Sequence, residues 1–148
     1  MKEYTVILVY RQNYRQVLLQ MKTRGPVFNI GKWNGIGGKL EHDELPMAGA
    51  LRESGEEAGL LDSDFVMFEH LCSQELPVSS MTEEAAKLYV FYGLLKDGVD
   101  FKQTEDEKLT WFESDNLLRM YDLLAGFGNL MHWHDMVVSH YKGVNKWS

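Results

Sequence analysis

The sequence predicts an α/β fold in which a mixed β-sheet is sandwiched between helices. Short runs of β-branched and apolar residues alternate with turn formers, which indicates several strands. Two other segments repeat apolar residues at helical spacing. With 148 residues, 45% of them hydrophobic, the chain is long enough to bury a sizeable core. We therefore expect residues 1–148 to form a single domain.

Five strands are expected, and the first two form a hairpin around the polar turn at residues 11–15. They are Tyr4–Tyr10, Gln16–Met21, Phe65–Leu76, Lys87–Leu95 and Leu109–Phe112. A further segment, Trp33–Glu41, carries glycines at positions 35, 37 and 38. This pattern indicates strands broken by a bulge or by a close approach of two backbones.

One helix is expected between Pro46, which suits a first turn, and Gly59, which suits a helix end. Its small and apolar residues at 48, 51, 55 and 58 are expected to form the packed side, with the glutamates on the opposite side. A short helical turn is expected at Ser114–Met120. A last helix is expected from about Leu130, where residues 130, 133, 137 and 141 follow helical spacing.

The net charge of −7 is unevenly distributed, because residues 1–41 carry +5 and the rest carries −12. So acidic a chain is a poor binder of nucleic-acid polymers, although a basic lobe facing an acidic helix could hold a small polyphosphate. No apolar run is long enough to cross a membrane, and the N-terminus is interpreted as a strand and not as a signal peptide. Cys72 is the single cysteine, which suits a reducing cytoplasm, the expected location.

Glu53, Glu56 and Glu57 lie three and four positions apart on the expected helix. Like charges at this spacing repel each other and weaken an isolated helix. Three carboxylates on one face require a counter-charge, and hard divalent cations with oxygen ligands provide it.

These glutamates belong to a longer pattern: Gly38, five residues, Glu44, seven residues, and then RESGEEAGL from Arg52 to Leu60. The pattern resembles the Nudix box, the signature of hydrolases that cleave a nucleoside diphosphate linked to another group. One position departs from it, since Ser54 stands where the family usually has an aliphatic residue. The resemblance implies a Nudix fold (α/β/α) and an enzyme that acts on phosphoanhydride bonds.

The resemblance also implies a cofactor, Mg²⁺ or Mn²⁺, held by Glu53, Glu56, Glu57 and the backbone carbonyl of Gly38. Arg52 is expected to orient the carboxylates through a salt bridge, and Glu44 to brace the loop or the helix start. One of the box glutamates, or another acid in a later loop, would act as the base on water. Candidates for that further acid are Glu105, Asp106 and Glu107, of which Glu107 is favoured; the alternative is an acidic, solvated turn.

The stretch KWNGIGGK at 32–39 resembles the WNG-x-GGK segment of the MutT-like branch, whose members act on oxidised purine nucleoside triphosphates such as 8-oxo-dGTP. Asn34 could contact the base or sugar, or it could be a turn residue. Lys22 could contact phosphate, pack its stem on a base or be a solvated charge, and Lys39 could also contact phosphate. Near the end of the chain, Phe127 could stack on a base and Asn129 could read it, although Asn is also a favoured helix N-cap. The aspartate pair of the eukaryotic relatives is missing here.

These expectations combine into a Mg²⁺-dependent nucleoside triphosphate pyrophosphohydrolase for oxidised or modified purine dNTPs, releasing a nucleoside monophosphate and pyrophosphate. Its partner is a small-molecule nucleotide, and the sequence leaves monomer or homodimer open. The alternatives are hydrolysis of another nucleotide (a pyrimidine dNTP, a dinucleoside polyphosphate or a nucleotide sugar) or a nucleotide-sensing module without turnover.

Overall fold

The computed structural model describes residues 1–23, 30–78, 84–103, 108–125 and 128–146, with side chains up to residue 140. The described residues form a six-stranded sheet of β1 (Lys2–Arg11), β2 (Gln16–Met21), β3 (Trp33–Asn34), β4 (Phe65–Leu76), β5 (Ala86–Leu95) and β6 (Leu109–Glu113). The helices are α1 (Pro46–Ala58), η2 (Asp62–Asp64), η3 (Ser114–Leu123) and α2 (Asn129–Lys146), where η marks a 3-10 helix. No helix in these ranges is long and apolar enough to span a membrane.

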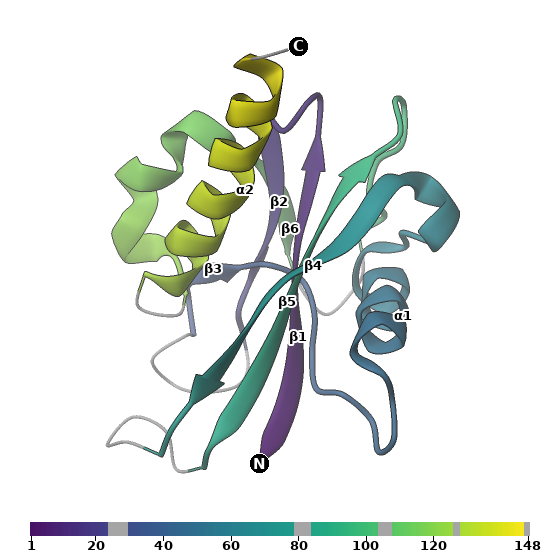
Figure 1. The fold of residues 1–148 in the computed structure, drawn as a ribbon, viewed down its shortest axis with the longest axis vertical. Helices are drawn as coiled ribbons and strands as arrows, with labels where there is room; N and C mark the ends of the chain where they lie inside the picture. The colour runs from purple at the N-terminus through teal and green to yellow at the C-terminus, as the bar shows by residue number, and fades with distance from the viewer. Residues whose placement is uncertain (24–29, 79–83, 104–107, 126–127, 147–148) are drawn as a thin grey trace.

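The sheet is mixed, as predicted (Figure 1). Its strands follow the order β3-β2-β1-β5-β4, with β6 paired to β2. The predicted hairpin is confirmed, because β1 and β2 are antiparallel with Val9 opposite Leu18. β1 also pairs in parallel with β5 along most of its length, from Lys2 opposite Ala86 to Tyr10 opposite Leu94.

The glycine-rich segment after β3 runs along the N-terminal half of β1. Ile36 and Ile7 exchange backbone hydrogen bonds of 2.7 and 3.1 Å, and Thr5 N donates to Gly38 O at 2.8 Å. A Cβ on Gly35 would lie 2.6 Å from Ile7 O, so only glycine permits this contact. The expected close approach of two backbones is thus confirmed, while only Trp33–Asn34 of the expected segment is a strand.

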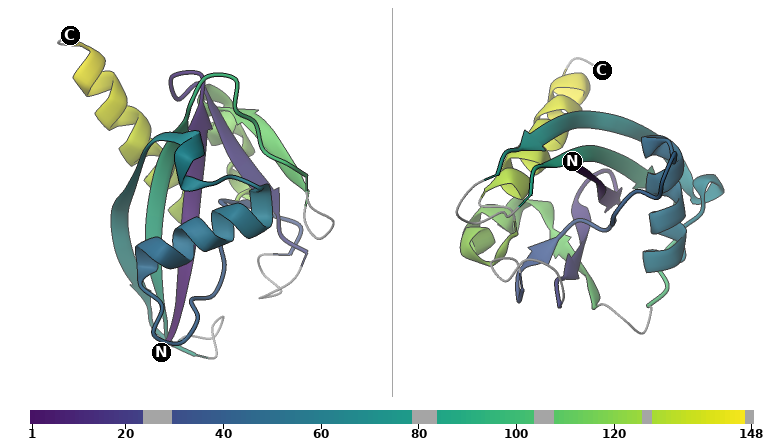
Figure 2. Two further views of the ribbon diagram at one scale, coloured as in Figure 1. Left: turned by 90° about the vertical axis from the view of Figure 1, so that its right-hand side faces the viewer. Right: turned by 90° about the horizontal axis from the view of Figure 1, so that it is seen from below.

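Helices cover both faces of the sheet, which confirms the α/β/α layering (Figure 2). One face packs against α1, through residues that include Ile7, Val9, Leu18, Ala50 and Ala58. The opposite face packs against η3 and α2, through residues that include Val6, Leu8, Tyr10, Leu117, Leu130 and Trp133. Ile36 of the glycine-rich segment belongs to the same core set as Ala50 and Ala58, so this segment and helix α1 lie on the same side of the sheet.

The ends of α1 agree with the prediction. Pro46 occupies the first turn, where its missing N–H costs no hydrogen bond. Gly59 ends the helix in the left-handed region, with φ of 64°, and its N–H donates to Gly55 O at 3.0 Å.

The packed side of α1 differs from the predicted one. The buried residues are Gly49, Ala50, Glu53, Ser54 and Ala58, so of the expected set only Ala58 is buried. Ala48 is exposed, and Leu51 and Gly55 are half-buried. Small residues at 50, 54 and 58 form a stripe four residues apart that lets the helix approach the sheet closely. Compared with the prediction, α1 is therefore rotated about its own axis, so that Glu53 points inward, toward Gly38.

Candidate functional site

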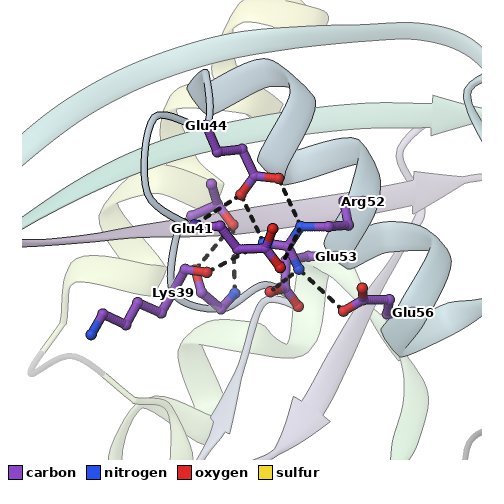
Figure 3. A network of polar contacts seen from close by, with 8 residues as sticks. Lys39, Glu41, Glu44, Arg52, Glu53 and Glu56 are labelled. Atoms are coloured by element: carbon purple, nitrogen blue, oxygen red, sulfur yellow. Dashed lines mark hydrogen bonds and ion pairs between the residues drawn. The ribbon is translucent and has the colours of Figure 1, made fainter.

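Arg52, on α1, contacts the carboxylates of Glu44, Glu53 and Glu56 (Figure 3), which together with Glu57 are called the carboxylate cluster. Its Nε and Nη2 donate to the two oxygens of Glu44 at 2.7 and 2.8 Å, a bidentate pair. Its Nη1 donates to Glu53 Oε1 at 3.0 Å and to Glu56 Oε2 at 3.1 Å. A single guanidinium therefore donates hydrogen bonds to three carboxylates, and Glu41 Oε1 lies within ion-pair distance of Arg52 Nε at 3.9 Å.

Glu44 braces the loop before α1, in agreement with the sequence expectation. Besides the Arg52 pair, Glu44 Oε1 accepts the Glu41 N–H at 3.0 Å. Arg52 Nη2 in turn donates to the Lys39 carbonyl at 3.3 Å. The hydrogen bonds from Arg52, and then that from the Glu41 backbone, lower the pKa of Glu44 to about 2. Residues 39–44 are thereby tied to the helix by a carboxylate that stays ionised.

Glu53 is the buried member of the cluster, with 7% of its surface exposed. Burial raises the pKa of Glu53, and the neighbouring Glu57 and Glu56 add to this, while Arg52 opposes it. A Cβ on Gly38 would lie 2.7 Å from Glu53 Oε1. Gly38 therefore provides the space that the Glu53 carboxylate occupies.

Glu57 is held by a residue that the sequence analysis missed. Gln20 Nε2, from β2, donates to Glu57 Oε2 at 2.7 Å. The signal in the sequence was slight: a polar residue two positions after Leu18 in the run QVLLQM, where alternation would place an apolar side chain.

The donor set of this cluster suits a hard divalent cation. It consists of carboxylate and carbonyl oxygens, the ligands that Mg²⁺ and Mn²⁺ prefer, and the burial of Glu53 favours a nearby positive charge. Within the described ranges, no three acidic, histidine or cysteine side chains are placed so that together they could hold a metal ion. Their oxygens are instead engaged by Arg52 and Gln20, and Gly38 O accepts the Thr5 N–H at 2.8 Å.

The side chains of the predicted substrate-binding residues form no hydrogen bond with the cluster carboxylates in the described part of the chain, although Asn34 lies opposite Gln20 on the β2–β3 ladder. Asn34 Oδ1 accepts the Gly35 N–H at 2.8 Å, a turn contact. Lys22 is half-buried and binds Lys32 and Gly31 through its backbone. The exposed Lys39 side chain points away from the cluster (Figure 3).

Asn129 is the first residue of α2, on the opposite face of the sheet from α1. Its Oδ1 accepts a hydrogen bond of 3.3 Å from Gln74 Nε2. Trp33 packs edge-on against Phe112 with a centroid distance of 4.8 Å, as part of the core. Glu107 and Phe127, predicted as acid and stacking residue, lie outside the described residues.

Comparisons with known proteins identify the family. The model of the NUDIX domain matches residues 1–133. The oxidized purine nucleoside triphosphate hydrolase of Mus musculus is 36% identical over 121 residues, covering 77% of this chain and 67% of the mouse protein. The protein of the same name from Danio rerio is 48% identical over 59 residues, covering 40% of this chain and 35% of its own length.

Solved structures share the fold at low sequence identity. The MutT protein of Methanosarcina mazei Go1 has a TM-score of 0.69 and 22% identity, covering 98% of this chain and 95% of its own. The NUDIX domain of Shewanella oneidensis NrtR, solved with ADP ribose, has a TM-score of 0.72 and 15% identity, covering 93% and 86%. The fold is therefore the predicted Nudix fold. Together with the domain match over residues 1–133, it shows that this chain belongs to the Nudix hydrolase family.

Proposed function

We propose that this protein is a Mg²⁺- or Mn²⁺-dependent nucleoside triphosphate pyrophosphohydrolase that acts on oxidised or otherwise modified purine dNTPs. The observation that carries the proposal is the 36% identity to the mouse oxidized purine nucleoside triphosphate hydrolase. The reaction adds water across the α–β phosphoanhydride and releases a nucleoside monophosphate and pyrophosphate.

In this proposal Glu53, Glu56 and Glu57, with the carbonyl of Gly38, hold the cation. When bound, the cation polarises phosphoryl oxygens and acidifies a water. Arg52 supports the reaction indirectly, because its ion pairs with Glu53 and Glu56 fix where those carboxylates lie. A carboxylate of the cluster, or that of Glu107, accepts the proton of the attacking water.

The substrate side of the proposal assigns the base and phosphates to residues outside the cluster. Asn34 and Asn129 offer amide groups to a purine edge, and Phe127 offers a stacking ring. Lys22 and Lys39 offer positive charge to the triphosphate. Neutral amides suit a modified purine because they can donate to one edge atom and accept from another.

A panel of nucleotides with product identification tests the substrate class. The panel contains 8-oxo-dGTP, dGTP, a pyrimidine dNTP, a dinucleoside polyphosphate and a nucleotide sugar, each assayed with Mg²⁺. We expect the highest kcat/KM for 8-oxo-dGTP, with pyrophosphate and not phosphate as the second product. Equal kcat/KM for dGTP and 8-oxo-dGTP would reject the oxidised-purine assignment.

Substitution of the cluster carboxylates tests catalysis as opposed to binding alone. Glu53→Gln and Glu57→Gln keep the side-chain shape but remove the charge, so we expect kcat to fall on the order of 100-fold or more. Glu113→Gln is the control, since Glu113 is exposed on β6 and outside the cluster. Activity that survives both cluster substitutions would show that these carboxylates do not hold a catalytic cation.

A further inference from the structure

Gln20 is a buried polar residue on the face of the sheet that packs against α1. It lies two residues after Leu18 on β2, so both side chains project from the same face. Only 1% of the Gln20 surface is exposed. An amide buried to this extent destabilises the fold unless both of its ends are hydrogen-bonded.

One end of the Gln20 amide is committed to the carboxylate cluster. Nε2 donates to Glu57 Oε2 at 2.7 Å, and this assignment of the amide is the only favourable one, because a reversed amide would place its oxygen against a carboxylate oxygen. Nothing among the described residues donates to the other end, Oε1, which is also buried. An acceptor therefore lies next to Glu57 with its hydrogen-bonding capacity unused by the protein.

The three box glutamates are held in different ways. Glu53 and Glu56 pair with the Arg52 guanidinium, at 3.0 and 3.1 Å. For Glu57, the described part of the chain offers no ion pair, only the neutral amide of Gln20. A neutral donor fixes the position of a carboxylate while leaving its negative charge uncompensated, which is what a ligand for a cation needs.

We propose that Gln20 is a positioning residue for the cation site: its N–H fixes Glu57 Oε2, and the amide is kept in this buried position, with Oε1 unpaired, for that contact. This inference rests on the proposed function, because it takes Glu57 as a cation ligand. Partners that orient a ligand in this way typically change metal affinity 10- to 100-fold.

Direct Mn²⁺ binding, without nucleotide, tests the inference. Free Mn²⁺ is followed by electron paramagnetic resonance while the metal is titrated into wild type, Gln20→Met and Gln20→Leu. Methionine has nearly the shape of glutamine without its polar ends, and leucine provides a second apolar replacement should methionine pack poorly. We expect Kd for Mn²⁺ to rise about tenfold or more in both variants.

Gln16 provides a matched control on the same strand. Its Nε2 donates to Glu113 Oε1 at 2.7 Å, the same type of bond at the same distance, but outside the cluster. Gln16→Met should leave Kd for Mn²⁺ within about twofold of wild type. A thermal melt of each variant without metal checks that affinity is compared between folded proteins.

A double-mutant cycle with Glu57→Gln tests whether Gln20 changes Mn²⁺ affinity through Glu57. If Gln20 acts through Glu57, then Gln20→Met should weaken Mn²⁺ binding much less in the Glu57→Gln background than in wild type. Equal Mn²⁺ affinity of wild type and both Gln20 variants, with nucleotide hydrolysis intact, would overturn this inference alone. A wild type that hydrolyses no nucleotide, while the Gln20 variants still lose Mn²⁺ affinity, would overturn the proposed function alone.

Discussion

Ser54 is a fully buried hydroxyl in the middle of α1, at the position where Nudix boxes usually carry an aliphatic side chain. No described residue forms a hydrogen bond with Ser54 Oγ. A buried hydroxyl without a partner destabilises a fold by about 1–3 kcal/mol. The residue therefore lowers the stability of the helix that carries the carboxylate cluster.

We predict that Ser54→Ala raises the free energy of unfolding by about 1 kcal/mol, since the unpaired hydroxyl is removed and little volume is lost. Urea denaturation of wild type and Ser54→Ala measures the difference in the free energy of unfolding. Ser139→Ala, at an exposed position of α2, reports the gain that alanine brings to any helix, expected at up to about 0.5 kcal/mol. A Ser54→Ala variant less stable than wild type would show that the hydroxyl has a partner after all.

At the scale of elements, the Glu44–Arg52 pair joins the loop at 39–44 to α1. Because the pKa of Glu44 is lowered from 4.5 to about 2 in the folded protein, its ionised form stabilises the fold. That stabilisation is fully present above pH 4.5. It is lost as the pH falls from 4.5 toward 2, where the folded protein also takes up the proton.

Glu44→Gln should therefore be less stable than wild type at neutral pH, and the difference should shrink between pH 4.5 and pH 2. Unfolding free energies measured by urea denaturation across this range give the comparison. Glu113→Gln is again the control, and its difference from wild type should stay small throughout. A Glu44→Gln deficit that does not change below pH 4.5 would contradict the lowered pKa.

Local sequence signals were enough for the elements but not for how α1 is turned. The strands at 16–21 and 65–76 and the helix from Pro46 to Gly59 match the prediction, because turn formers, proline and glycine act on their own neighbours. The buried side of α1 was mispredicted because a glutamate normally faces solvent. Glu53 is buried because Gly38, distant in the sequence, leaves room for it.

In the candidate site, too, contacts between residues close in the sequence could be predicted, whereas contacts between distant residues could not. The contacts of Arg52 with Glu44, Glu53 and Glu56 could be expected from the box, since they join residues of one helix and its lead-in loop. The contact of Gln20 with Glu57 could not be expected, because it spans 37 positions and depends on how β2 faces α1. The roles of Asn34 and Asn129 in binding remain predictions.

For the whole molecule, a net charge of −7 makes the folded state sensitive to cations. A cation that binds only the folded protein stabilises it by about 2.7 kcal/mol at a concentration 100 times its Kd. For a domain of this size we expect Tm to rise on the order of 10 °C with Mn²⁺ or Mg²⁺, and to return to its original value when a chelator is added. Calorimetry measures the shift.

Sodium chloride at matched ionic strength separates specific binding from general screening. A rise in Tm that sodium chloride reproduces would mean that the cation only screens repulsion. The Glu57→Gln variant should lose most of the specific rise, since it lacks one of the proposed ligands.

The parallel pairing of β1 with β5 has a consequence for how the chain reaches its fold. Lys2 lies opposite Ala86, so β1 cannot pair with β5 until the chain has been synthesised beyond residue 86. The β1–β2 hairpin, by contrast, closes over only a few residues. Because closing a long loop is entropically costly and slow, the late arrival of β5 should set the folding rate, with one hydrophobic strand edge open to aggregation until then.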